Sequence, residues 1–239
     1  MSSLLSFLRK TSAVLLLCGG VINAAPVLLQ PQPDTALLWD FTKATEDQVP
    51  DLGPKAIALK LTKVSEPFEL EPGGDRGGLI FSNTTSLVPA VRGPVIELPQ
   101  NQVTIETWLK INPSAGARAM GILQYAEYGK AGFRLLVEKT GRLSFLLQTG
   151  TREARVLSWS SVPVDRWVHV AATYDGKVMR LYLDGAENGI EEVTDGVVQP
   201  PGNQQLFVGY IGSPDKPFFQ GVINSIRIST TARTKFDVK

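Results

Sequence analysis

In the stretch DRWVHVAATYDGKVMRLYLDG, Asp165 to Gly185, apolar side chains recur at every second position on both sides of an Asp-Gly pair. A period of two is typical of β-strands, and Asp-Gly between two such runs is a strong hairpin signal. We therefore expect two antiparallel strands joined by a tight turn at Asp175-Gly176. A second pair, Asp184-Gly185, is expected to close this unit.

Short strands with the same period are expected along most of the chain. The clearest is Val103 to Ile111, and no stretch of ten or more residues after residue 24 has helical periodicity. The other expected strands cover residues 36–42, 55–64, 79–82, 86–91, 95–98, 120–125, 133–138, 143–149, 154–159, 205–211 and 221–228. Turn residues separate them, and Asn188-Gly189 is interpreted as one of these turns. The pattern predicts an all-β, antiparallel β-sandwich.

Residues 1–24 have the pattern of a secretory signal peptide, with Arg9-Lys10 before an apolar run and small residues up to Ala24. The run is too short to span a membrane. We therefore expect a secreted or periplasmic protein without a transmembrane segment in its mature chain. Residues 25–35 contain three prolines and are interpreted as a linker or irregular lead-in. Residues 36–239 are then one domain.

The net charge limits the classes of partner that the protein can be expected to bind, and the cysteine count indicates what stabilises the fold. The chain has 24 basic and 23 acidic residues; removing Arg9 and Lys10 with the signal peptide leaves 22 against 23, a net charge of −1. This balance does not suggest a nucleic-acid partner or an anionic membrane surface. The single cysteine, Cys18, follows Leu16-Leu17 rather than the small residues of a lipid-attachment signal. The mature domain would then have no disulfide and depend on its core.

Four motifs in series resemble the laminin-G-like branch of the concanavalin A-like lectin/glucanase superfamily. Thr104 to Trp108 matches the T-I-E-x-W strand, and Trp167 to Gly176 matches the W-x-H-V-A-x-T-Y-D-G strand and turn. Tyr182 to Gly185 matches the Y-x-D-G strand end. Phe219 to Ile228 matches the closing F-x-G-x-I-D-x-x-R-I strand, except that Asn224 stands where the family commonly has Asp.

The resemblance covers roughly residues 36–239 and implies a jelly roll of two curved antiparallel sheets. It also implies a non-catalytic module that binds glycans or proteins outside the cell, often with a bound Ca²⁺. Loop oxygens near Asp47 and Asp51 are candidate calcium ligands, because Ca²⁺ takes about six to eight oxygen ligands and accepts carbonyls. The change to Asn224 weakens the transfer of a calcium site to the closing strand.

Enzymatic chemistry has little support in the sequence. The only histidine, His169, lies in the middle of an expected strand, where a structural, hydrogen-bonded role is favoured over that of a general base. One histidine and one cysteine cannot form a zinc site of the His/Cys type. Glycosidases of the superfamily place carboxylates along one strand, whereas Glu191-Glu192 with Asp195 has the wrong spacing and Glu106 stands alone. We expect no catalytic residues, with a divergent glycoside hydrolase as the enzymatic alternative.

Aromatic residues are the candidate ligand contacts, because flat rings stack on sugar faces and tyrosine and tryptophan add a polar tip. Trp39, Trp108 and Trp167 lie within strand patterns and are expected in the core. Rings near strand ends and loops are expected to be exposed. Together with one acidic residue they form the candidate ligand-binding set: Tyr125, Tyr128, Trp159, Tyr210, Asp215 and Phe218. Carbohydrate binding is the first hypothesis, and protein–protein adhesion or envelope assembly is the alternative.

Overall fold

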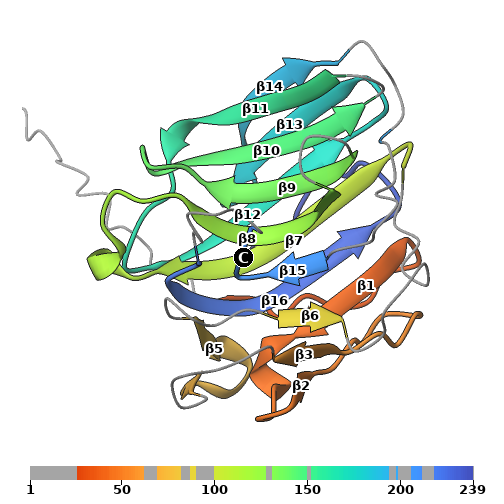
Figure 1. Ribbon diagram of the computed structural model, residues 1–239. Helices are drawn as coiled ribbons and strands as arrows, with labels where there is room; N and C mark the ends of the chain where they lie inside the picture. Colours follow the sequence, from red (N-terminus) through yellow and green to blue (C-terminus); the bar gives the residue numbers. More distant parts are fainter. Residues whose placement is uncertain are drawn as a thin grey trace, which may run out of the picture.

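Two antiparallel sheets packed face to face make up the protein (Figure 1). The computed structural model describes residues 26–61, 69–81, 87–89, 100–127, 131–149, 152–193, 198, 206–211 and 218–238. Helical structure in these ranges is limited to single 3-10 turns at Phe41–Lys43, Gly74–Arg76 and Pro113–Ala115. The predicted all-β jelly-roll sandwich is confirmed. None of the helical turns in this part of the chain is long and apolar enough to cross a membrane.

Sheet A contains the strands that the sequence predicts most clearly. Its order is β14-β13-β12-β7-β16-β5-β4, and β1 also pairs with β16. Strands β7 and β16 therefore lie at its centre. The strands are β1 (Thr35–Asp40), β4 (Leu70–Glu71), β5 (Gly78–Phe81), β7 (Val103–Ile111), β12 (Trp167–Tyr174), β13 (Val178–Leu183), β14 (Ala186–Glu192) and β16 (Gly221–Ser229).

Sheet B has the order β11-β10-β9-β8-β15-β6-β3-β2. Its strands are β2 (Gln48–Val49), β3 (Leu59–Leu61), β6 (Leu87–Pro89), β8 (Met120–Glu127), β9 (Ala131–Val137), β10 (Arg142–Thr149), β11 (Arg152–Ser161) and β15 (Leu206–Val208). Strands β2, β4 and β14 were not predicted. The strand expected at residues 95–98 lies outside the described residues.

The two Asp-Gly pairs form the turns at both ends of β13. Asp175-Gly176 joins β12 to β13 as predicted, and the Asp175 carboxylate accepts hydrogen bonds from the backbone N–H groups of Lys177 and Val178. Asp184-Gly185 does not close the unit. Its two residues have φ angles of 49° and 77° and form a two-residue turn of type I′ that leads into β14.

Asn188-Gly189, interpreted from the sequence as a turn, lies inside β14. The reason is a contact between the edges of the two sheets. Asn188 Oδ1 accepts hydrogen bonds from the backbone N–H and hydroxyl of Ser160 on β11, at 3.0 and 3.1 Å. A Cβ atom on Gly189 would lie 2.8 Å from the carbonyl oxygen of Leu157. Glycine is required here because β11 passes close by, and the chain does not turn.

The main core lies between the sheets, and a smaller apolar cluster lies on the outer face of sheet A. Trp39 is buried in the main core as expected. Trp108 is also fully buried, but on the outer face, where it packs with Leu29 and Leu38. Trp167 is only half-buried against this outer cluster, so its expected place in the core is wrong.

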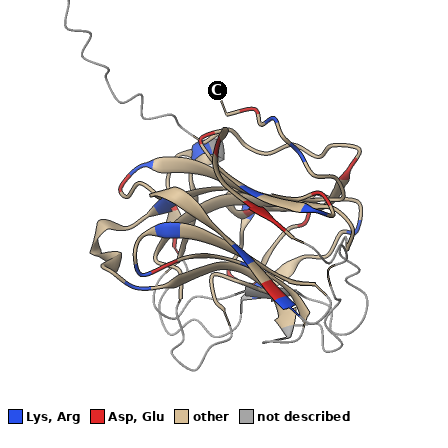
Figure 2. Cartoon of the chain, turned by 90° about the horizontal axis from the view of Figure 1, so that it is seen from above, with Lys and Arg blue, Asp and Glu red and all other residues tan. Residues whose placement is uncertain are grey.

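Both ends of the described chain lie against the outer face of sheet A. Leu29, from the irregular segment before β1, is buried there. After β16, the ring of Phe236 lies 5.3 Å from that of His169 and 4.8 Å from that of Tyr182, between centroids. Charges of both signs are interspersed over the drawn residues (Figure 2).

Asn224, where the family commonly has aspartate, has a structural role on β16. Its buried Nδ2 donates a hydrogen bond to the carbonyl of Gly77 at 2.8 Å, and its Oδ1 accepts one from the Ser225 hydroxyl at 3.0 Å. A carboxylate cannot donate to a carbonyl. The amide at this position therefore fixes the loop before β5 in a way that aspartate could not.

Candidate functional site

Three aromatic side chains gather at the outer face of sheet B. Phe207 lies on β15 between Leu206 and Val208, which point into the core, so its own side chain points outward. Its ring meets that of Tyr210 edge-on at 5.5 Å between centroids. Tyr210 in turn stacks on Phe218 at 4.8 Å, with an angle of 24° between the rings. All three are half-buried, and we call Phe207, Tyr210 and Phe218 the aromatic cluster.

A line of cross-strand neighbours extends from the aromatic cluster over the same face. Phe207 on β15 pairs with Gln124 on β8, which pairs with Arg134 on β9. Arg134 pairs with Leu146 on β10, which pairs with Arg155 on β11. We call these five residues the cross-strand row. Because neighbouring strands lie about 4.8 Å apart, the row is about 19 Å long.

Two glutamine amides on this face have no hydrogen-bond partner among the residues that the structure describes. They belong to Gln124 and Gln148, whose side chains are largely enclosed, with 4% and 7% exposure. Gln148 lies opposite Glu153, whose carboxylate pairs with Arg134. An amide both donates and accepts hydrogen bonds, whereas a guanidinium only donates. The face therefore combines flat apolar rings with both kinds of hydrogen-bonding group.

The structure brings together two of the sequence-predicted residues, Tyr210 and Phe218. Tyr125 is elsewhere: it is only 4% exposed and packs on Phe133 in the core, at 5.6 Å between rings. Its expected exposure is wrong because β8 continues to Glu127, so that residue 125 is not at a strand end. Trp159 is 61% exposed, but it lies on the edge strand β11, with three strands between it and β15.

Tyr128 and Asp215 lie outside the described residues. Sequence reasoning missed Phe207 and Gln124, although a signal for both was present. Each stands between two core residues in a predicted strand, and the period of two places such a residue on the opposite face.

The candidate calcium ligands do not fit a metal site as they are arranged. Asp51 Oδ1 accepts hydrogen bonds from the backbone N–H groups of Leu38 and Gly53, and Oδ2 accepts one from Ile57. Its oxygens therefore hold a loop together, whereas Ca²⁺ would need them as ligands. Asp47 is exposed. Within the described ranges, no three or more His, Cys, Asp or Glu side chains are grouped to hold a metal ion.

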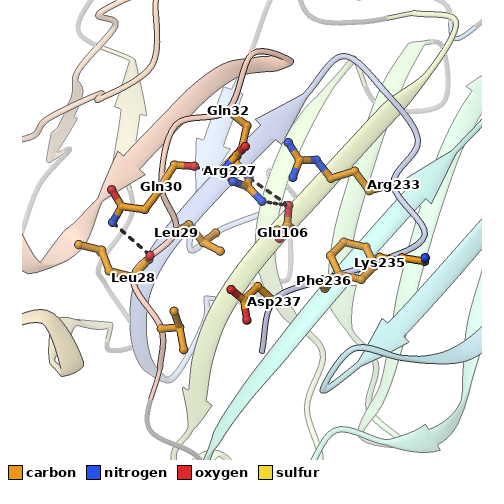
Figure 3. A pocket seen from close by; sticks show the side chains of 11 residues that line it. Leu28, Leu29, Gln30, Gln32, Glu106, Arg227, Arg233, Lys235, Phe236 and Asp237 are labelled. Atoms are coloured by element: carbon orange, nitrogen blue, oxygen red, sulfur yellow. Dashed lines mark hydrogen bonds and ion pairs between the residues drawn. The ribbon is translucent and has the colours of Figure 1, made fainter. Parts of the chain in front are cut away.

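A buried charged pair, unforeseen from the sequence, lies on the outer face of sheet A (Figure 3). Arg227 on β16 stands opposite Glu106 on β7, and its Nε and Nη2 donate to Glu106 Oε2 at 3.0 and 2.6 Å. The Arg227 Nη1 donates to the backbone carbonyl of Gln30 at 2.6 Å. The two side chains are only 7% and 2% exposed. The pair thus ties the segment before β1 to the centre of the sheet.

His169 lies next to this pair. Its Nε2 is 3.4 Å from Glu106 Oε1, and its Nδ1 has no hydrogen-bond partner in the described part of the chain. A hydrogen-bonded structural role was expected for His169, but only one of its two ring nitrogens has a partner among the described residues. Burial acts to raise the pKa of the Glu106 carboxyl, but the hydrogen bond with His169 and the charge of Arg227 outweigh it. Together they hold the pKa of Glu106 below its ordinary value of 4.5.

Comparison with known proteins places this fold in a family. A laminin G family model, described as the concanavalin A-like lectin/glucanases superfamily, matches residues 84–239. The chain belongs to this superfamily. The matched range contains the aromatic cluster, the cross-strand row and the Glu106–Arg227 pair.

Part of pappalysin-1 is similar to this chain in sequence. The mouse protein (Mus musculus) is 27% identical and the human protein (Homo sapiens) 26% identical over 157 residues, which is 60% of this chain. The match covers only 10% of either pappalysin. The chain therefore corresponds to a small part of these relatives.

Several toxin binding domains share the fold. The receptor binding domain of botulinum neurotoxin D superposes with a TM-score of 0.62 at 13% identity, over 84% of this chain and 50% of that one. The binding domain of Paraclostridial Mosquitocidal Protein 1 superposes with a TM-score of 0.61 at 14% identity, over 84% and 49%. At such identities the likeness shows the fold alone, and this chain spans about half of each toxin domain.

Replacing Arg227 with methionine should destabilise the protein by about 3 to 5 kcal/mol, because it leaves a buried carboxylate without its cation. The double change Glu106→Gln with Arg227→Met should be more stable than Arg227→Met alone, since no unpaired charge remains. Urea unfolding of the three proteins measures both effects. If Arg227→Met is as stable as the wild type, the ion pair is not needed for the stability of the fold.

The lowered pKa of Glu106 predicts a pH dependence of stability. A carboxyl whose pKa is lower in the folded than in the unfolded state stabilises the fold above its ordinary value of 4.5. That contribution is lost as the pH falls through the folded-state pKa. Unfolding free energies measured from neutral pH to about pH 3 should therefore fall more steeply for the wild type than for Glu106→Gln. Equal slopes would contradict the assignment.

Proposed function

We propose that this protein is a non-catalytic recognition module, secreted or periplasmic, that binds carbohydrate on the outer face of sheet B. The observation that carries the proposal is the junction of the aromatic cluster with the cross-strand row. Phe207 belongs to both: it is the cross-strand partner of Gln124, and its half-buried ring contacts that of Tyr210, which stacks on Phe218.

The chemistry of this face suits a sugar ring better than an apolar or an ionic ligand. Sugar rings have an apolar face that packs on aromatic carbon and a rim of hydroxyls that both donate and accept hydrogen bonds. Gln124 and Gln148 have hydrogen-bonding capacity that no described residue uses. Because the row crosses five strands, the face has room for several sugar units, which favours an oligosaccharide or polysaccharide.

The structural relatives support recognition in general. They are binding domains of toxins: the ligand binding domain of botulinum neurotoxin D has been determined in complex with N-acetylneuraminic acid, and the binding domain of botulinum neurotoxin DC in complex with rat synaptotagmin II. These ligands belong to the toxin domains, of each of which this chain matches about half. One ligand is a sugar and the other a protein, so the relatives support a binding role without choosing its chemistry.

Protein–protein adhesion or envelope assembly is the second candidate, and a different surface favours it. Trp159 on β11 is 61% exposed and Ile190 on β14 is 46% exposed, on the two strands whose edges meet at Asn188. Exposed aromatic and aliphatic side chains are typical anchors of protein interfaces. A glycosidase has less support, because the cross-strand row itself has none of the paired carboxylates that such enzymes use.

The test is binding of the mature chain, residues 25–239, to a broad panel of polysaccharides with Ca²⁺ and with a chelator. For the tightest binder, Tyr210→Ala should weaken binding about fivefold, by about 1 kcal/mol, through loss of ring stacking. Gln124→Leu should also weaken binding, because leucine keeps most of the volume of the side chain but cannot hydrogen-bond to the sugar. Trp159→Ala is the matched control, because it removes an exposed aromatic residue that three strands separate from β15, and it should leave the affinity unchanged.

Each alternative has its own result in this experiment. Polysaccharide binding that only Trp159→Ala abolishes would move the carbohydrate site to β11. Capture of a protein from envelope extract without any glycan binding would replace the carbohydrate proposal with the adhesion role. Binding lost on chelation would show that calcium takes part through ligands other than Asp51. Release of reducing sugar would revive the hydrolase.

A further inference from the structure

A pocket of about 300 Å³ opens on the outer face of sheet A, on the side of the sandwich opposite to the aromatic cluster (Figure 3). Glu106 and Arg227 lie at its base. Residues 27–30 and 32 form one wall, and residues 233 and 235–237 form the other. The pocket therefore lies between the two ends of the described chain and above the centre of the sheet.

The charges around this pocket are already balanced. Arg227 is paired with Glu106. Arg233 is paired with Asp34, to which its Nε donates at 3.1 Å and its Nη2 donates a second bond. The charged residues that line or flank the pocket are three cations and three anions: Arg227, Arg233, Lys235, Asp34, Glu106 and Asp237. At the base of the pocket, an ionic ligand would have to separate Arg227 from Glu106 or bury an uncompensated charge.

A neutral ligand with several hydroxyls meets no such cost. A hydroxyl can donate to a carboxylate and accept from a guanidinium at the same time, so it fits between paired charges without separating them. The side chains of Gln32 and Asp237 are exposed and make no hydrogen bond with any described residue. The pocket also has an apolar side, formed by Val27, Leu28 and Phe236, which are half-buried.

We infer that this pocket binds one neutral sugar unit, either a free monosaccharide or the terminal residue of a glycan. Its volume is at the lower end of the range for small-molecule sites, which suits a single ring. The site shares no residue with the aromatic cluster or the cross-strand row, so it does not depend on the proposed function. A sugar bound here would contact both terminal segments and stabilise them against the sheet.

The experiment uses the mature chain and three methyl glycosides with one ring and different charge: those of glucose, glucuronate and glucosamine. The methyl glycosides of galactose, mannose and N-acetylglucosamine extend the neutral set. Saturation-transfer NMR and the shift of the thermal midpoint measure binding. A neutral glycoside should bind more tightly than its charged counterparts. Preference for glucuronate or glucosamine would overturn the inference, as would the absence of any binding up to about 10 mM.

Variants locate the site. The double change Gln32→Ala with Asp237→Ala removes two exposed polar groups that hold nothing in the fold, and should weaken binding at least fivefold. Asp47→Ala, an exposed aspartate outside the pocket lining, and Tyr210→Ala should leave it unchanged. Binding that the double variant leaves intact would overturn the inference, whereas a loss with Tyr210→Ala would assign the sugar to sheet B.

A last comparison distinguishes the two sources of the sugar. An oligosaccharide that carries the bound sugar at its end should bind as tightly as the methyl glycoside if the pocket takes terminal residues. Weaker binding of the oligosaccharide, with the free sugar retained, would assign the pocket to monosaccharides.

Discussion

The ion pair between Glu106 and Arg227 is the interaction on which the arrangement of this molecule depends. Moving a carboxylate and a guanidinium out of water is costly, and the cost is offset only when geometry and hydrogen bonding are good. Here two donors of Arg227 reach one oxygen of Glu106, and a third reaches the carbonyl of Gln30. The pair lies on β7 and β16, the central strands of sheet A, and extends its hydrogen bonding to the segment before β1.

This arrangement gives the two sheets different surfaces. On sheet A, the segments before β1 and after β16 lie over the outer face. Asp34 and Arg233 join these two segments, and Arg227 of the ion pair holds the first of them to the sheet through the carbonyl of Gln30. The ring of Phe236 packs against the imidazole of His169. On sheet B, the outer face carries half-buried aromatic rings and amides without partners among the described residues. The proposed recognition surface on sheet B and the proposed sugar pocket on sheet A both rest on this difference.

Sequence reasoning succeeded where the determining contacts are local. The hairpin at Asp175-Gly176 depends on neighbouring residues, and the period of two in β7, β12, β13 and β16 reports directly which side chains face the core. It was wrong about Asn188-Gly189, because the need for glycine comes from a carbonyl 32 positions earlier, at Leu157. It also missed the pairing of Arg227 with Glu106, which are separated by 121 positions. For the candidate site, Tyr210 and Phe218 were found, but the place of Tyr125 depended on where a strand ends.

Chemical-shift mapping in solution can show whether the outer face of sheet B is the recognition surface. Glutamine side-chain NH₂ groups give their own signals in a ¹H–¹⁵N spectrum, so Gln124 and Gln148 report on this face without any mutation. Addition of the tightest-binding oligosaccharide should shift both side-chain signals together with the backbone amides of residues 206–210. If these signals stay in place while the carbohydrate binds and others shift, the carbohydrate binds elsewhere on the molecule and the outer face of sheet B is not the recognition surface.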